Sequence, residues 1–254
     1  MSARAETSDS ARNHTVPTQN DATVVNVMSA LAMEMAINRW LKPKFESESG
    51  LRLNIDWRPT AALMKSIAEG QRADMVIAIA GSMDRLVAEG IVQPQTRTTL
   101  ADSALGVGVR QGSPRPDVST VEAFKRAMVD ARAVAYSKAG ASGLYFADLI
   151  ARLGIADVVN AKAVIIPMGF TAEKVANGEA DLAVQQISEL MTVPGIDVIG
   201  PFPAEIQVAS RFDAAVFATA ANAQGAKAFL RILTSSAAAK AYAEGGLTSR
   251  LAQR

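Results

Sequence analysis

Four short segments of the sequence place small, hydroxyl or amide residues where a predicted strand gives way to a predicted helix. They are residues 29–32, 58–61, 138–143 and 185–188. In open α/β sheets such junctions meet at the carboxyl ends of the strands, where ligand crevices form. Free backbone N–H groups and the positive ends of helices favour an anion there, and hydroxyl side chains add donors. The pattern predicts a binding site for a small anion.

The residues predicted to bind this anion lie in the first turn of a helix or in the loop before it: Ser29, Ala30, Arg58, Thr60, Ala61, Lys138, Ser142, Gly143, Gln185 and Gln186. Ser and Thr at such places often serve only as helix caps, which is the competing interpretation for Thr60 and Ser142. Arg58 and Lys138 would neutralise carboxylates, the arginine through two hydrogen bonds. Simple solvation of these two cations is the alternative.

Residue types that many enzymes need are scarce in this chain. It has no cysteine and one histidine, His14, in a polar leader. Disulfides, thiolate nucleophiles and cysteine-based zinc sites are therefore excluded, as are a Ser-His-Asp triad and a multi-histidine metal site within one chain. Neither residues 106–112 nor the loop at 138–143 has the spacing of a nucleotide-binding motif. We expect no metal and no cofactor.

Charge and hydropathy limit the partners. The 254-residue chain carries 26 basic and 25 acidic residues, a formal net charge of +1, and has no basic stripe interleaved with aromatics. We therefore expect no nucleic-acid partner. No apolar stretch approaches the roughly 20 residues that span a bilayer, so no membrane insertion is expected.

Residues 1–21 are small, polar and charged, and they lack the apolar run of a secretory signal. We expect a disordered tail. The compartment is the periplasm if a signal was removed from the native precursor, and the cytoplasm otherwise.

From Thr23 onward, short apolar runs alternate with segments of helical period, which is typical of βαβ units. Strands are predicted at residues 23–28, 51–57, 74–78, 105–109, 133–137, 164–166, 182–184, 196–199 and 214–218. Helices are predicted at residues 32–46, 61–69, 83–89, 121–131, 143–153, 171–176 and 222–244. Thr60, Ser142 and either Ser119 or Thr120 are expected to cap three of them.

The chain shows no linker long enough to separate independent domains. We therefore expect an α/β fold of two lobes joined by crossing strands, each lobe a mainly parallel sheet flanked by helices. The first lobe is predicted to hold residues 22–105 and 210–254, and the second to hold residues 106–209.

Several short motifs carry a family resemblance: residues 25–30 (VNVMSA), 57–63, 70–78 (GQRADMVIA), 133–154 (AVAYSKAGASGLYFADLIARLG), 178–182 (GEADL) and 213–217. From about Ala22 to Leu247 the chain resembles the molybdate-binding periplasmic solute-binding proteins. The resemblance implies the type II periplasmic-binding fold, with a ligand cleft between two α/β lobes. It also implies an ABC-transporter permease as a partner.

Some positions depart from that family's pattern. The family's first-loop serine falls on Ala32, with Ser29 earlier in the turn, and its cleft tyrosine falls on Gln185. Its second-loop serine falls on or near Thr60 or Ala61. Together with the basic junction residues, these changes favour an anion with several carboxylates over molybdate.

Residues 185–195 (QQISELMTVPG) and 200–207 (GPFPAEIQ) resemble a branch of the family to which aconitate isomerase is similar. This resemblance implies a cofactor-free enzyme that moves a double bond in a tricarboxylate. Such a reaction requires a base that removes an allylic proton and donors that hold the carboxylates. Glu189 and Glu34 are the carboxylates nearest to the predicted cleft loops, although both also fit exposed positions on a helix.

Three functions are therefore open, and the first is favoured. The chain is a monomeric binding protein that closes over a small oxyanion or organic polycarboxylate. Alternatively, it is a cofactor-free isomerase of an unsaturated organic acid. A third possibility is a cytoplasmic anion sensor without a transport partner.

Overall fold

The computed structural model describes residues 23–138 and 140–251, so the tail predicted at residues 1–21 lies outside the described residues. The strands are β1 (Val24–Ala30), β2 (Arg52–Arg58), β3 (Met75–Ile79), β4 (Thr98–Arg110), β5 (Val134–Ser137), β6 (Ala163–Ile166), β7 (Leu182–Gln186), β8 (Ile196–Pro201), β9 (Ala209–Val216) and β10 (Thr248–Ser249).

The helices are α1 (Glu34–Ala36), α2 (Lys42–Ser49), α3 (Thr60–Ala68), α4 (Ala80–Ala88), α5 (Val121–Asp130), α6 (Ala141–Arg152), α7 (Ala156–Asn160), α8 (Ala172–Ala176), α9 (Ile187–Thr192), α10 (Ala223–Leu233) and α11 (Ser236–Glu244). A π-helical segment, Ile37–Leu41, joins α1 to α2, and a 3-10 turn, Leu31–Met33, precedes α1. No helix among the described residues is long and apolar enough to cross a bilayer.

In the described part of the chain, the strands pair in the order β2-β1-β3-β9-β4-β7-β5-β6, with β8 and β10 paired to β4. β1 is parallel to β2 and β3, and β5 is parallel to β6 and β7. The pairs that involve β4 and β9 are antiparallel. β4 serves both halves of the molecule, since residues 98–104 pair with β9 and residues 105–108 pair with β7.

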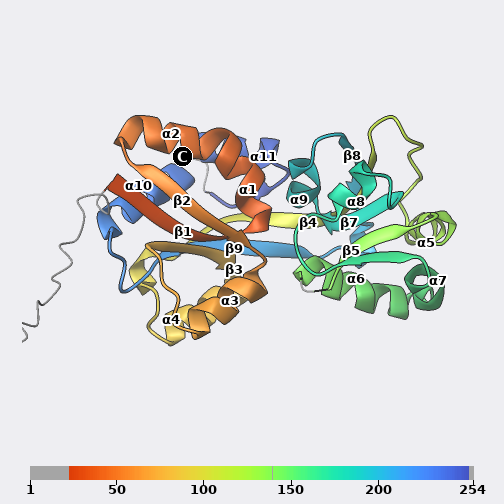
Figure 1. Ribbon diagram of the computed structural model, residues 1–254, viewed down its shortest axis with the longest axis horizontal. Coiled ribbons are helices and arrows are strands. Elements are labelled where there is room, and N and C mark those ends of the chain that lie inside the picture. The colour runs from red at the N-terminus through yellow and green to blue at the C-terminus, as the bar shows by residue number, and fades with distance from the viewer. Residues whose placement is uncertain (1–22, 139, 252–254) are drawn as a thin grey trace, which may run out of the picture.

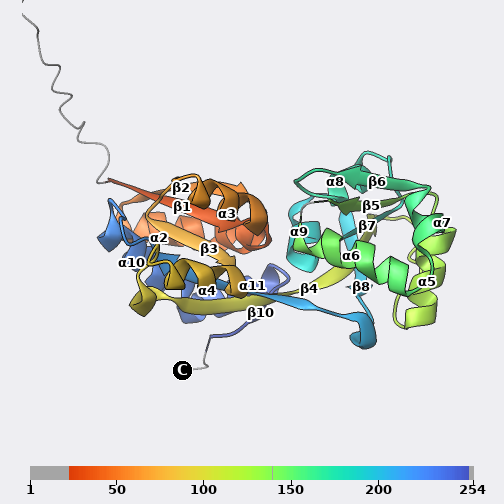
Figure 2. The ribbon, with the colours of Figure 1, turned by 90° about the horizontal axis from the view of Figure 1, so that it is seen from below.

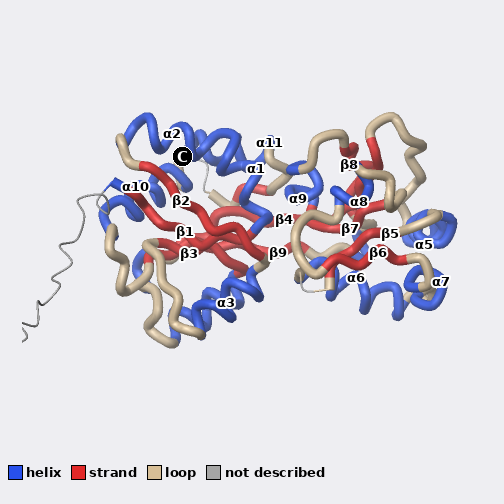
Figure 3. The backbone as a smooth tube through the Cα atoms, viewed as in Figure 1, coloured by secondary structure: helices blue, strands red, loops and turns tan. Residues whose placement is uncertain are grey.

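Two lobes result from this pairing. Figures 1 and 2 show them side by side, joined by β4 and by the chain that leads into β9. In the first lobe, α2 and α10 cover one face of the strands while α3 and α4 cover the other (Figure 1), and Figure 3 shows the same layers by type of element. The predicted α/β fold with two lobes is confirmed.

Each lobe has its own apolar core on both faces of its strands. Side chains of β1 alternate, since Val27 packs in one cluster with Phe45 while Met28 packs in another with Leu63. In the second lobe, Phe146 belongs to the larger cluster, and smaller side chains around Val175 form the other. Every cluster stays within one half of the molecule, and the lobe boundaries given above remain a prediction.

Both crossing strands are longer than the sequence predicted. β4 begins at Thr98 instead of residue 105, and β9 begins at Ala209 instead of residue 214. Their early residues mix polar side chains with a few apolar ones such as Leu100 and Phe212, and therefore lack the clear apolar signal used to find strands. Asp102 of β4 accepts hydrogen bonds from Arg211 of β9 and from Arg250 beyond β10, so tertiary ion pairing stabilises this stretch.

Two of the three predicted helix caps are wrong. α3 begins at Thr60 itself after Pro59, and α6 begins at Ala141 after Gly140, both without a capping side chain. The cap of α5 is confirmed, since the Thr120 hydroxyl accepts a hydrogen bond from the Ala123 N–H at 3.2 Å.

Candidate functional site

A cavity of about 190 Å³ lies between the two lobes, at the carboxyl ends of β1, β3, β5 and β7. Its size suits a ligand smaller than the drug-sized molecules that occupy pockets of about 300–1000 Å³. Both lobes line it: Ala30, Leu31, Pro59, Thr60, Ala61, Ile79, Ser82 and Phe212 from the first, and Ser137, Gly140, Ala141, Ser142, Leu144, Gly169, Gln185, Gln186 and Glu189 from the second.

Three helices begin at this cavity without a capping side chain. They are α3, α4 and α6, whose N-cap residues are Pro59, Ile79 and Gly140. The backbone N–H groups in the first turn of a helix have no partner within the helix, and the helix dipole makes that end positive. Uncapped ends therefore leave N–H groups available for an anion.

Several predicted site residues line this cavity. They are Ala30, Thr60, Ala61, Ser142, Gln185, Gln186 and Glu189. The structure thus brings together residues that are more than 150 positions apart in the chain, such as Ala30 and Glu189.

Five predicted residues do not line it. Ser29 is buried in β1, and its hydroxyl donates to the Ala30 carbonyl at 3.3 Å. Lys138 is exposed. Glu34 is partly buried, which raises the pKa of its carboxyl, but it does not reach the cavity. Gly143 has a packing role, since a Cβ there would lie 1.8 Å from the Ser137 carbonyl oxygen. Arg58 is the fifth.

Arg58 is held by its own lobe. Its guanidinium forms a bidentate ion pair with Asp56 and donates to the Ser66 hydroxyl at 2.8 Å. Among the described residues that line the cavity there is no Lys or Arg. The positive potential at this site therefore comes from backbone N–H groups and not from cationic side chains.

Glu189 is the one charged side chain among the described residues that line the cavity. It lies in the first turn of α9 and is 6% exposed. Burial raises the pKa of the Glu189 carboxyl to about 7, against the opposing effect of hydrogen bonds from the Gln186 N–H and the Gln185 side chain. At neutral pH the carboxyl can therefore both accept and release a proton.

The two neighbouring glutamines have different roles. The Gln185 oxygen accepts from the Thr171 N–H at 2.8 Å, and its amide nitrogen donates to the Gly169 carbonyl at 2.9 Å, so it fixes the loop before α8. Gln186 faces the N–H of Glu189 in a capping-box arrangement, but its buried side-chain oxygen makes no hydrogen bond of ordinary geometry.

The Thr60 hydroxyl is also buried without a hydrogen-bond partner among the described residues. Thr60 and Gln186 come from opposite lobes and line the same cavity. Buried polar groups are normally paired, so two unpaired ones in a single cavity point to a ligand or ordered water that completes them.

Sequence reasoning missed two kinds of lining residue. Ser82 lies in the first turn of α4, at a strand-to-helix junction of the same type as the four that were recognised. The junction between β3 and α4 therefore offered a signal in the sequence from which Ser82 could have been predicted. The apolar lining outside the recognised junctions, which is Ile79, Leu144 and Phe212, carries no local signal because its members meet only in the folded chain.

These features define a class of protein: a two-lobed α/β binding protein whose interlobe cavity presents helix N-termini. The model of the family described as "Bacterial extracellular solute-binding protein" matches residues 25–248. The chain belongs to that family.

The chain is also similar to individual known proteins. An aconitate isomerase from Pseudomonas sp. is 36% identical over 231 residues, which cover 89% of this chain and 87% of that protein. The periplasmic molybdate-binding protein of Azotobacter vinelandii has a similar fold, with a TM-score of 0.74, 20% identity, and coverage of 90% of this chain and 100% of that one. The sulfate-binding protein SubI of Mycobacterium tuberculosis follows at a TM-score of 0.70 and 17% identity, covering 90% of this chain and 87% of its own.

Proposed function

We propose that the interlobe cavity binds a small unsaturated acid with more than one carboxylate, and that the protein isomerises it by moving a proton through Glu189. The observation that carries this proposal is the buried Glu189 carboxyl inside a cavity otherwise built for an anion. An ionised carboxylate repels an anionic ligand, so a protein that only binds anions would gain affinity from a neutral residue there. An isomerase that moves a proton, in contrast, needs such a carboxyl in contact with the ligand.

The shape of the lining supports an organic ligand. Leu31, Ile79, Leu144 and Phe212 form apolar surface beside the helix ends. A tetrahedral oxyanion has no hydrocarbon to place against these side chains, whereas an organic acid has both carboxylates and a carbon skeleton. The similarity to a Pseudomonas aconitate isomerase supports the same ligand class.

The chemistry needs no group beyond the chain itself. The Glu189 carboxylate takes a proton from the CH2 next to the double bond, and the C–H electron pair becomes the new double bond. The electrons of the old double bond move onto the conjugated carboxylate. The electron pair then returns from the carboxylate to the former alkene carbon and takes the proton from Glu189, so the formula of the acid is unchanged.

The uncapped ends of α3, α4 and α6 contribute to this step by holding the carboxylates. N–H groups that already point at the site stabilise the extra negative charge of the intermediate without reorganisation. The anion-binding helix ends of the cavity would thus serve catalysis together with the Glu189 carboxyl.

Proton NMR of cis- and trans-aconitate with the purified protein tests the proposal. We expect interconversion by the wild type and a loss of at least about 100-fold in Glu189→Gln, with binding of the acid retained. Glu34→Gln is the matched control, since Glu34 lies outside the cavity, and it should keep the wild-type rate. Wild-type turnover in Glu189→Gln would contradict the assignment.

A second candidate is a transport-binding protein that delivers an oxyanion to an ABC-transporter permease. The described lining of the cavity contains no cationic side chain, which favours this function. An oxyanion would then be bound by the N–H groups at the helix ends alone. Thermal stabilisation by molybdate, tungstate or sulfate, with none by tricarboxylates, would support this function and reject the first one.

The family's description as extracellular supports a periplasmic location over a cytoplasmic one. The lining of the cavity comes from both lobes of one chain, so a single chain could form the site in either function, and the monomeric state stays a prediction.

A further inference from the structure

A second and larger cavity, of about 630 Å³, lies in the second lobe. Arg132, just before β5, and Asp181, just before β7, both line it. It therefore opens at the beginning of these strands, while the interlobe cavity lies at their other end. The two cavities share none of their lining residues.

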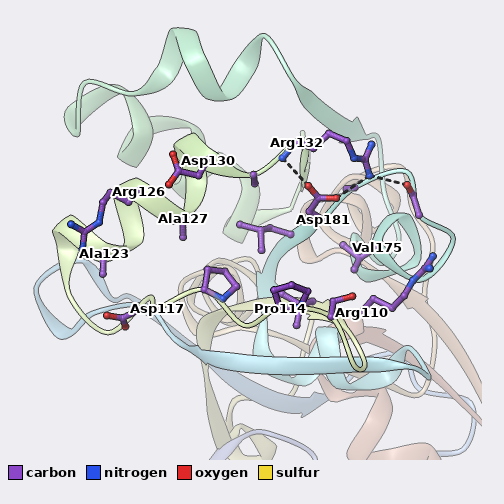
Figure 4. A pocket seen from close by; sticks show the side chains of 17 residues that line it. Arg110, Pro114, Asp117, Ala123, Arg126, Ala127, Asp130, Arg132, Val175 and Asp181 are labelled. Atoms are coloured by element: carbon purple, nitrogen blue, oxygen red, sulfur yellow. Dashed lines mark hydrogen bonds and ion pairs between the residues drawn. The ribbon is translucent and has the colours of Figure 1, made fainter.

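The walls of this cavity are apolar. Helix α5 forms one side with Ala123 and Ala127, one turn apart, and the loop with Pro114 and Pro116 faces it, as Figure 4 shows for Pro114. Buried side chains of Val109, Val175 and Leu182 also line it. A volume within about 300–1000 Å³, apolar walls and a few polar groups are the usual features of a ligand pocket.

Two arginines define one end. Arg110 donates to the Ala176 carbonyl at 2.8 Å, and Arg132 donates to the Gly178 carbonyl at 3.0 Å and to Asp181 at 2.9 Å. This end of the cavity thus holds two guanidiniums and one carboxylate, that of Asp181, which pairs with Arg132 and leaves excess positive charge. Among the described residues, none accepts a hydrogen bond from Nε or Nη1 of either arginine.

Gly178 allows this arrangement. Its φ of +84° favours glycine, and a Cβ there would lie 3.0 Å from Nη2 of Arg110. The backbone turn and the guanidinium could not both keep their places with a larger residue.

The opposite end has a different charge. Asp117, Arg126 and Asp130 lie on the far side of the cavity from Arg110 and Arg132 (Figure 4). Two carboxylates with one guanidinium give this end excess negative charge. An anionic group therefore has one favourable place in the cavity, at the two arginines.

We propose that this cavity is a second binding site, for an amphipathic anion whose carboxylate or sulfonate lies at Arg110 and Arg132. Its apolar body lies between α5 and the loop that contains Pro114. Arginine suits this role because its planar donors match a carboxylate or sulfonate and remain charged at every relevant pH.

Fluorescence titration with 1-anilinonaphthalene-8-sulfonate, an amphipathic sulfonate, tests the site in the full chain. We expect saturable binding that weakens at least tenfold in Ala127→Phe, which fills the cavity, and in Arg110→Gln, which removes a partly solvated guanidinium and leaves the apolar walls intact. Unchanged binding in both folded variants would overturn the proposal.

Competition between the probe and eight-carbon ions of opposite charge tests whether the site requires an anion and not only an apolar chain. Octanoate should displace the probe, and octyltrimethylammonium should not. Equal displacement by the cation would overturn the assignment of an anion. Glu189→Gln serves as the control for the interlobe cavity, and probe displacement should be unaltered in it, because that residue lines only the other cavity.

Discussion

Helix N-termini are treated differently in two regions of this molecule. Among the described helices of nine or more residues, α5, α10 and α11 each have a capping side chain, from Thr120, Asn222 and Ser235. The other three, α3, α4 and α6, begin at the interlobe cavity and have none. A cap usually stabilises a protein by about 1 kcal/mol. Its absence at these three longer helices is consistent with N–H groups kept for a ligand.

The two regions also treat carboxylates differently. Away from the interlobe cavity, the Ser119 N–H and hydroxyl donate to Asp117 and lower the pKa of its carboxyl. At the cavity, burial raises the pKa of Glu189 to about 7. The first carboxylate is stabilised in its charged form, and the second is held where a proton can be exchanged.

The largest expected effect concerns the pH dependence of stability. The pKa of Glu189 rises from 4.5 in the unfolded chain to about 7 in the fold, so the folded state binds more protons between these values. Raising the pH through this window therefore lowers the free energy of unfolding. The loss is on the order of 3 kcal/mol, because each unit of pKa difference corresponds to about 1.36 kcal/mol. Urea unfolding at pH 4.5 and pH 8 should show this loss in the wild type and not in Glu189→Gln.

A negative cap at a cavity helix should be the next largest effect. Gly140→Asp fits sterically, because a Cβ there meets only ordinary contacts of 3.6 Å or more. Its carboxylate would occupy the N–H groups of α6 and repel the ligand, so we expect an affinity loss of at least about 2 kcal/mol, or thirtyfold. Thr120→Asp, which exchanges one cap for another on α5, is the control for calorimetric titration. Equal affinities in both variants would break the comparison.

Removing single hydroxyls should separate the two regions further. Thr120→Ala should cost about 1 kcal/mol of stability, because it deletes the cap of α5, and leave ligand affinity unchanged. Thr60→Ala should leave stability nearly unchanged, because its hydroxyl has no partner in the described chain, and weaken ligand binding by about 1 kcal/mol. Thermal unfolding and titration of both variants give the result, and the reverse pattern would contradict the account.

The smallest effect is expected at Arg58. Its guanidinium pairs with Asp56 on a partly exposed surface, and such pairs contribute about 0–1 kcal/mol to stability. Because Arg58 does not line the interlobe cavity, Arg58→Ala should also change ligand affinity less than about threefold. A larger loss of affinity in the same titration would contradict this expectation. It would indicate that Arg58 contacts the ligand in a closed form of the cleft.

Much of the fold could be predicted because apolar periodicity is a local signal. It placed β1 and α3 within a few residues, and the motif order gave the two lobes. The first half of β4 was missed, since its residues are mixed in polarity and its partners, β9 and Arg250, are distant in sequence. The Arg58 pair could have been expected, because residues two apart on a strand lie on the same face.

The site was less predictable for the same reason. Whether Thr60 and Ser142 cap their own helices or face a cavity depends on where each helix begins, which differs from the prediction by one residue for α3 and by two for α6. The burial of Glu189 depends on how α9 packs at the interface of the lobes, which periodicity does not describe.

The central claim is that Glu189 moves a proton on a carboxylic acid bound at uncapped helix ends. Its most direct test is deuterium incorporation into aconitate in heavy water, followed by NMR with the wild type, Glu189→Gln and Glu34→Gln. We predict that the wild type and Glu34→Gln exchange the allylic hydrogens of the acid, and that Glu189→Gln binds the acid without exchange. Exchange at the wild-type rate in Glu189→Gln, or none in any of the three despite tight binding, would contradict the claim.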